Sequence, residues 1–406
     1  MAIKKIKLIH ISVFLLICDF LALIFLGKTY TKFLVFDFGI YAHDLLLTII
    51  TILCFFEFDW KRNRLYSIEI LIILSLLYLI VSFIRNDFDV VNKGYIILRQ
   101  YAIFGYLAFF YVITKKLMTS SKAKEYTIKA LYVFGIVCIV LQFVHIINLY
   151  VNTNLLQIIE RNAYSPMVVM GFFVFISFVF TRDYLNQITK FFISVFVILL
   201  SISIGHDSAY LGILLIGISY IFIISNKKTK IAIAFTGILM MILILLFLPT
   251  FSDHNAQWRL IYWEHILSRS LSNYLFLGEG FGVQYASNTT IESLNNLMLS
   301  NGYNALILED EKYLTAPHNS FLSMILHTGI PSIIFLLIPF RTIFIIKNVV
   351  RNRNILFLVL SLIGMTVWAS FNVVLELPHS SSIFWIVYFL LSLSLKKTNL
   401  EQARKF

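Results

Sequence analysis

The sequence predicts an all-α polytopic membrane protein, and three observations support that class: its composition, its long apolar runs and the placement of its basic residues. Of 406 residues, 59% are hydrophobic and only 13% are charged, about half the charged fraction of a soluble domain. At roughly 20 apolar residues per membrane span, this hydrophobic content suffices for about 12 transmembrane helices. A water-soluble fold is therefore excluded.

The apolar runs give the order of the predicted helices. The first run, 8–26, follows Lys4, Lys5 and Lys7 and has no small-residue cleavage site after it. It is too long for the apolar core of a signal peptide, so we expect it to remain as the first span. The full set of predicted spans is 8–26, 38–56, 68–84, 95–113, 127–149, 166–181, 190–204, 209–224, 231–248, 325–346, 355–371 and 382–395.

The basic residues predict the orientation of these spans. With the N-terminus inside, 24 of the 33 Lys and Arg residues fall in cytoplasmic segments and 9 in outer segments, as expected for a multi-pass protein with both termini in the cytoplasm. The net charge of +12 is thus a topology signal, and no nucleic-acid partner is expected. The three cysteines lie inside apolar runs without metal-binding spacing, so neither a metal site nor a cofactor is expected.

One connection is much longer than the others. It covers residues 249–317, between the ninth and tenth predicted spans on the outer face, within a single integral membrane domain of residues 1–406. Long loops often carry functional residues. We therefore expect an extracytoplasmic loop with short amphipathic helices that holds the functional site.

The beginning of this loop predicts an amphipathic helix. Asp253 or Asn255 can cap its start, and Arg259, Trp263 and Ile266 then share one face. Arg259 is a candidate for binding an anion, and it can also stack on Trp263 as a cation-π pair. A helix of this kind can also simply lie at the membrane surface with its aromatic residues among the headgroups.

Two further motifs lie in the same loop. Gly278 and Gly280 form a glycine turn that permits close approach of the backbone to a ligand, or that simply turns the chain. At the end of the loop, Pro317 precedes His318 and Asn319, which place an imidazole at the mouth of a membrane helix or merely cap that helix.

Together these pieces resemble the O-antigen polymerase and O-antigen ligase superfamily (Wzy-type polymerases and lipopolysaccharide ligases). The resemblance rests on Arg259-x3-Trp263, Gly278-x-Gly280, His318-Asn319 with Leu322 and Gly329, Leu375-Glu376-x-Pro378 before Phe384-Trp385, Tyr41-x2-Asp44, and Arg161 five residues before Pro166. The chain departs from the family at Gly205-His206-Asp207-Ser208, where a Ser-Arg pair is common.

The resemblance implies a glycosyltransferase of the bacterial cytoplasmic membrane. Such an enzyme transfers an oligosaccharide from undecaprenyl diphosphate, with inversion and without a metal, onto a lipid-linked repeat unit or another acceptor. The implied partners are the lipid-linked donor and acceptor, the bilayer, and a regulator of polysaccharide chain length. The product would be an exopolysaccharide, a capsule or an O-antigen.

The residue roles follow from that chemistry. Diphosphate is the leaving group, and arginine makes forked contacts to phosphate oxygens, which selects Arg161 and Arg259, with Arg99 as a third candidate. Arg161 can instead pair with the neighbouring Glu160. Histidine titrates near neutral pH, so His318 is the expected base, or the group that orients the acceptor.

The other candidates are substrate-binding groups. Glu376 is an alternative base or an acceptor-binding carboxylate, and Asn319, Trp263, Gly278 and Gly280 are expected to line the substrate site. Asp44 and Asp207 are expected to pack helices.

Two alternatives to a polymerase remain. A ligase uses the same donor and similar motifs, and the multispanning peptidoglycan glycosyltransferases are a more remote member of the same class. A transporter or lipid-linked oligosaccharide flippase, from a different class, can have a similar number of spans. Transporters often consist of two related halves, which this sequence does not show, so an enzyme is favoured.

Overall fold

The computed structural model describes residues 8–26, 28–31, 33–36, 40–56, 64–86, 93–152, 166–203, 207–231, 254–300, 309–341 and 352–403. These residues form 15 α-helices and one two-stranded hairpin, in agreement with the predicted all-α class. In the first half of the chain, the elements are α1 (Leu8–Phe25), α2 (Lys28–Thr31), β1 (Leu34–Phe36), β2 (Ile40–Tyr41), α3 (Ala42–Phe56), α4 (Tyr66–Arg85), α5 (Gly94–Leu117), α6 (Ser121–Asn152), α8 (Pro166–Phe180), α9 (Gln187–Ile202) and α10 (Asp207–Ile224).

The second half contains α12, α13 and the C-terminal helices. Its elements are α12 (His254–Arg269), a π-helical turn η1 (Ser270–Tyr274), α13 (Asn288–Ser300), the 3₁₀ turn η2 (Glu309–Tyr313), α14 (Ser320–Thr328), α15 (Ile330–Leu337), the 3₁₀ turn η3 (Ile338–Phe340), α16 (Arg353–Ala369) and α17 (Pro378–Ala403).

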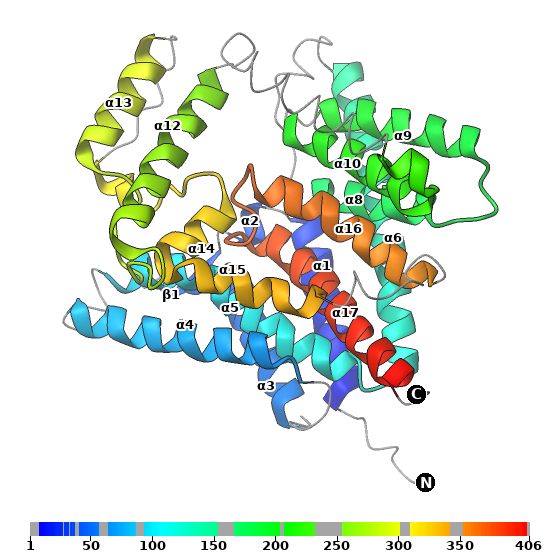
Figure 1. Cartoon of the computed structure of the whole chain (residues 1–406), viewed down its shortest axis with the longest axis horizontal. Coiled ribbons are helices and arrows are strands. Elements are labelled where there is room, and N and C mark those ends of the chain that lie inside the picture. Colours follow the sequence, from blue (N-terminus) through cyan, green and yellow to red (C-terminus); the bar gives the residue numbers. More distant parts are fainter. Residues whose placement is uncertain are drawn as a thin grey trace.

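Helix α17 runs through the centre of the molecule. It contacts α5, α8 and α16, and Figure 1 shows it passing diagonally between the helices of the N-terminal half and those that follow. The serines of this buried helix bond to the carbonyl one turn back, as Ser382 does to Pro378 at 2.6 Å and Ser392 to Tyr388 at 2.8 Å. Their hydroxyls are therefore satisfied within the helix and do not oppose its burial.

The long apolar helices indicate a multi-pass membrane protein. Among the described residues, four helices are long and apolar enough to cross a bilayer: α4, α5, α6 and α17. A fifth span is possible if α14 and the helical stretch that follows it are counted as one bent element. Six further apolar helices, namely α1, α3, α8, α9, α10 and α16, are shorter.

The predicted count of about twelve spans is not supported. The hydrophobic content does form helices at nearly every predicted position, but a helix of 15 residues, such as α3 or α8, is only about 22 Å long against a hydrocarbon core of about 30 Å. Apolar runs therefore overestimated the number of full crossings. Residues 232–248 of the predicted span 231–248 lie outside the described residues.

Two predicted spans also have a different local structure. The run 38–56 begins with β2, which pairs with β1 in an antiparallel hairpin, so its helix begins only at Ala42. The run 325–346 is broken at Gly329, where φ is +75° and the chain bends by 119° between α14 and the helix that follows. Glycine permits this backbone conformation, and Pro331, in the first turn of the helix that follows, favours a new helix start.

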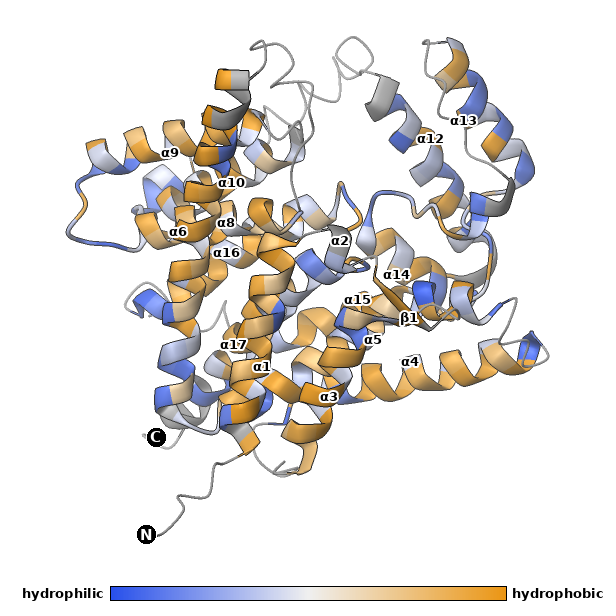
Figure 2. Ribbon diagram, turned by 180° about the vertical axis from the view of Figure 1, so that it is seen from behind, coloured by the Kyte–Doolittle hydropathy of each residue, from blue (hydrophilic) through white to orange (hydrophobic). Residues whose placement is uncertain are grey.

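Helices α12 and α13 stand apart from the apolar bundle. In Figure 1 they lie together at one corner, on the opposite side from α6, α8, α9 and α10. Figure 2 shows that both carry many hydrophilic residues, whereas α1, α3 and α4 are hydrophobic over most of their length. This polar part of the chain contains most of the candidate site.

Candidate functional site

Helices α12 and α13 share a small hydrophobic core with α14. Trp258, Tyr262 and Ile266 lie one turn apart on α12, and their buried face packs together with Leu322 and Leu326 of α14. Only 7% of Trp258 and 1% of Tyr262 are exposed. These two residues are therefore part of a protein core and are not in the headgroup layer, where an interfacial helix would place them.

The same helix holds the segment that carries His318. The Tyr262 hydroxyl donates to the carbonyl of Thr315, and the Trp263 indole donates to the carbonyl of Pro317 at 2.6 Å. The rings of Trp258 and His318 meet edge to face, with centroids 5.3 Å apart. These contacts fix the position of the imidazole relative to α12.

Arg259 is placed beside this segment. It lies next to Trp258 and one turn, about 5.4 Å along the helix axis, before Trp263, and its side chain is half-buried. The two neighbouring indoles both contact residues 317–318. The predicted arginine therefore lies on α12 between two residues that contact the His318 segment.

His318 has a strained backbone. Its φ is +49°, and it is the one non-glycine residue with positive φ in the described part of the chain. Its amide donates to the carbonyl of Ala316 at 2.8 Å, which tightens the turn around Pro317. A left-handed conformation at a non-glycine residue costs of order 1–2 kcal/mol and is found most often at functional sites.

Asn319 caps helix α14. Its side-chain oxygen accepts hydrogen bonds from the amides of Phe321 and Leu322, both at 3.1 Å. This is the capping alternative considered from the sequence. The cap sets the direction of α14 directly behind His318, while a substrate-binding role for Asn319 stays a prediction.

Ser320 connects the start of α14 to Glu376. Its hydroxyl donates to the Glu376 carboxylate and accepts from the amides of Val374 at 2.9 Å and Leu375 at 3.0 Å. Asn372, in the same connection, donates to the Ser208 hydroxyl at 2.7 Å. The connection between α16 and α17 is thereby fixed against the N-terminal turn of α14.

Glu376, which accepts the hydrogen bond from Ser320, is a buried carboxyl group. It is only 4% exposed, and this burial raises its pKa above the ordinary glutamate value. The hydroxyls of Ser320 and Ser323 and the positive charge of Arg99 lower the pKa and partly oppose that rise. Arg99, half-buried on α5, therefore acts electrostatically on the same site.

Tyr285 and His327 extend the network, and neither is among the residues that the sequence predicts for the site. The Tyr285 hydroxyl and His327 Nε2 are 3.1 Å apart, and His327 Nδ1 lies 2.8 Å from the carbonyl of Gly280. Burial and the negative charge of Glu376 raise the pKa of Tyr285 well above its ordinary value. A tyrosine in a loop gives no sequence signal of a functional site. A histidine such as His327 inside an apolar run does give one, because ionisable residues are rare in such runs.

The glycine turn is held by the protein itself. The amides of Glu279 and Gly280 donate to the carbonyls of Leu326 at 2.7 Å and His327 at 2.9 Å. On the other side, Arg85 donates to the carbonyls of Glu279 and Phe281 at 2.8 and 2.6 Å. These bonds anchor the turn between α4 and α14. The glycines therefore allow the turn to pack closely against the backbone of α14.

Gly278 gives a direct test of that packing. Its φ is +62°, and an added Cβ would lie 2.5 Å from backbone atoms of His327 and Thr328. We expect Gly278→Ala to destabilise the protein by about 2–5 kcal/mol, from positive φ and overpacking together, measured as a lower Tm of the purified protein. Gly105→Ala is the control, because its Cβ would meet only the Tyr101 ring at 3.7 Å; equal effects would contradict the packing argument.

Eight of the nine candidate residues lie in this one region. Trp263, His318, Asn319 and Glu376 are joined by the contacts above, and Arg259 lies on α12 between Trp258 and Trp263. Arg99 lowers the pKa of Glu376 through its charge, and Gly278 and Gly280 lie against α14. Arg161 lies outside the described residues. Within the described ranges, no group of three or more His, Cys, Asp and Glu residues could hold a metal ion.

No protein-family model, curated protein or solved structure matches this chain. The resemblance to O-antigen polymerases and ligases therefore rests on the motifs themselves, and it stays a prediction.

Proposed function

We propose that the protein is a polysaccharide polymerase, which transfers an undecaprenyl-diphosphate-linked glycan chain onto a lipid-linked repeat unit at the outer face of the bacterial cytoplasmic membrane. The reaction would invert the anomeric carbon and need no metal. The observation that carries this proposal is the convergence of Arg259, His318, Glu376 and Arg99 in a polar region beside an apolar helical bundle.

The proposed reaction uses these groups in distinct roles. The acceptor hydroxyl attacks the anomeric carbon, the bond from that carbon to the diphosphate oxygen breaks, and its electron pair leaves with undecaprenyl diphosphate. Negative charge grows on the leaving group, where Arg259 would stabilise it. The proton of the acceptor hydroxyl would pass to His318 or to the Glu376 carboxylate.

The charge distribution supports the proposed orientation. Both termini would lie in the cytoplasm because 24 of the 33 basic residues fall on that side in the predicted topology. Residues 249–317, which include α12 and α13, would then form the extracytoplasmic loop. In that orientation the candidate site would lie at the face where a lipid-linked donor arrives, and a chain-length regulator would contact the same face.

A ligase remains the nearest alternative, because it would break the same bond and differ only in the acceptor. One observation points instead to a transporter. Asp19 of α1 and His43 of α3 form a fully buried pair at 2.8 Å, and ionisable groups inside membrane helices often mark transport pathways.

A deletion strain separates these functions. If the protein is a polymerase, its loss leaves single repeat units displayed on the cell surface and removes long polymer. Loss of a flippase traps the repeat units inside, and loss of a ligase leaves long polymer on the lipid carrier. The size distribution and location of the glycan, measured by gel electrophoresis after surface labelling, decide among the three.

Glu376 gives a pH-dependent prediction. Because burial raises its pKa in the folded protein, the stability that this carboxyl contributes is present below the unfolded pKa of about 4.3 and is lost as pH rises through the folded pKa. We expect Glu376→Gln, which keeps an acceptor for Ser320, to remove this loss. Tm measured between pH 4 and pH 8 should therefore fall less in the variant; parallel curves would contradict the prediction.

A further inference from the structure

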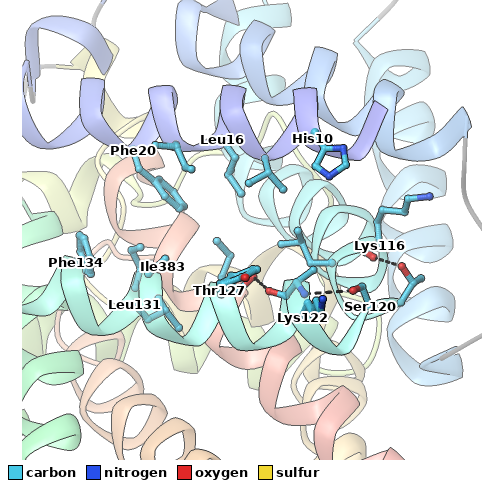
Figure 3. Close-up of a pocket in the computed structure, with 18 residues that line it drawn as sticks. His10, Leu16, Phe20, Lys116, Ser120, Lys122, Thr127, Leu131, Phe134 and Ile383 are labelled. Atoms are coloured by element: carbon cyan, nitrogen blue, oxygen red, sulfur yellow. Dashed lines mark hydrogen bonds between the residues drawn. The ribbon is translucent and has the colours of Figure 1, made fainter. Parts of the chain in front are cut away.

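A cavity of about 630 Å³ lies at a different place in the molecule, between α1 and α6. Ile383 and Ile386 of α17 also line it, as do residues of the connection from α5 to α6. Figure 3 shows α1 and α6 facing each other across it. The groups of the candidate site do not line this cavity.

The two ends of the cavity differ in chemistry. At one end, Phe20, Leu131 and Phe134 point into the cavity. Leu131 and Phe134 are buried in the protein, so this end is apolar. At the other end lie His10, Lys116, Ser120 and Lys122. An apolar end and a basic end together suit an amphipathic molecule with an anionic headgroup.

The length of the cavity matches one leaflet of a bilayer. Its wall on α1 extends from His10 to Phe20, and its wall on α6 from Lys122 to Phe134. At 1.5 Å per residue these walls are about 15 and 18 Å long, about half of the 30 Å hydrocarbon core. The chain of a lipid that enters from the leaflet would thus end near the middle of the membrane.

In the predicted topology, the basic end of the cavity lies on the cytoplasmic side, in the inner leaflet. The segment from Lys115 to Lys129 is one of the predicted cytoplasmic segments, and residues 1–7, which carry Lys4, Lys5 and Lys7, directly precede α1. Basic pockets between membrane helices on the cytoplasmic side are typical binding sites of anionic lipid headgroups. The N-terminal turn of α6 lies at the same end, and its dipole adds to the attraction of a phosphate.

The cavity reaches the surface of the helical bundle. Ile17 on α1 is 49% exposed and Tyr126 on α6 is 65% exposed, and both line the cavity. A lipid can therefore enter sideways between the two helices without unfolding of either.

We propose that this cavity binds one anionic phospholipid of the inner leaflet, with its phosphate at Lys116 and Lys122 and one acyl chain between α1 and α6. The lipid fills the space between two helices, and so it stabilises the attachment of α1, which otherwise packs on α3 and α8. This site is separate from the proposed transferase site, and it does not depend on that function.

Lipid titration of the full-length protein tests the proposal. The purified chain in a neutral detergent is titrated with dioleoyl phosphatidylglycerol, with dioleoyl phosphatidylcholine, and with inorganic phosphate as a third arm. Native mass spectrometry measures the bound lipid, and tryptophan fluorescence measures Tm. We expect one phosphatidylglycerol to bind and raise Tm, with little effect of phosphatidylcholine or phosphate.

The variants locate the site. We expect Lys116→Gln/Lys122→Gln to bind phosphatidylglycerol about 30-fold less tightly, which corresponds to about 1 kcal/mol for each lysine near the membrane surface. Lys129→Gln is the matched control, since Lys129 lies on the same helix, pairs with Glu125 and does not line the cavity. Ala130→Trp, which fills the apolar part, should abolish binding while both lysines remain.

Three results would overturn the proposal. Equal binding of phosphatidylcholine and phosphatidylglycerol would show a site without charge recognition, and stabilisation by inorganic phosphate alone would show a site for a free anion. Unchanged phosphatidylglycerol binding by Ala130→Trp would show that the lipid binds elsewhere. This last variant keeps the proposal testable even if the double lysine variant does not fold.

Discussion

His318→Gly is expected to abolish polymer formation while leaving the protein folded and at least as stable as the wild type. The backbone of His318 has φ of +49°, which glycine adopts without steric cost. The substitution therefore relieves strain of order 1–2 kcal/mol and removes the imidazole at the same time. Loss of a general base typically lowers the rate about 10²–10⁴-fold, so stability and activity should change in opposite directions.

Matched variants separate the imidazole from the backbone. His318→Ala keeps the strain and loses both the ring and its contact with Trp258, so it should be inactive and less stable than His318→Gly. His265→Gln is the control for loss of a histidine from α12, because His265 lies 3.0 Å from the Thr290 hydroxyl, away from His318. Polymerisation is measured with purified lipid-linked repeat units, and Tm by fluorescence.

The outcome discriminates between the two interpretations of the His318-Asn319 motif. If the motif only caps α14, Asn319 is sufficient, since its side chain accepts the amides of Phe321 and Leu322. His318→Gly would then make full-length polymer at normal rates, and His318 would have no chemical role.

The helices of this protein could be predicted from the sequence, but their environment could not. The spacing of Arg259, Trp263 and Ile266 predicted the helix α12 correctly, because a repeat of three to four residues defines one face of a helix. The face that is buried, however, is formed by Trp258, Tyr262 and Ile266. Periodicity does not tell whether that face meets lipid or protein. Only the packing of α12 on Leu322 and Leu326 shows that it meets protein.

Glycine motifs were ambiguous for a similar reason. Gly278 needs its positive φ, and the sequence signals that requirement. The neighbour that forces the close approach is the backbone of α14, far along the chain. Likewise, Gly329 lies in an apolar run that reads as one span, whereas the structure bends there by 119°. The Ile330 amide just after the bend donates at 2.9 Å to the carbonyl of Leu275, which lies far away in the sequence.

No local sequence pattern predicts that the candidate groups come close together in the fold. Arg99, Arg259, His318 and Glu376 belong to four separate segments, and the sequence selected each one individually. Ser320 and Tyr285, which connect Glu376 to its surroundings, had no signal because a serine at a helix start and a tyrosine in a loop are commonplace. Resemblance supplied the candidates, and the fold brings their segments to one part of the molecule.

Arg259→Ala is expected to lower the rate of polymerisation about 10²–10³-fold, the usual effect of removing one preorganised group that stabilises developing charge. If Arg259 contacts the departing diphosphate, the loss should appear mainly in kcat, because that charge is larger in the transition state than in the bound donor. Arg259→Lys keeps the charge but not the forked geometry, so it should recover only part of the rate.

Arg269 on the same helix provides the contrast. It forms an ion pair with Glu279 and donates to the carbonyl of Gln284 at 2.7 Å, so it stabilises the glycine turn. Arg269→Ala should therefore lower Tm, whereas Arg259→Ala should lower kcat with a much smaller change in Tm. If Arg259→Ala keeps wild-type kcat, diphosphate stabilisation must come from another cation, and Arg99 and Arg161 become the residues to substitute next. If both arginine variants lower Tm equally and leave kcat intact, α12 is a structural element and the proposed site is wrong.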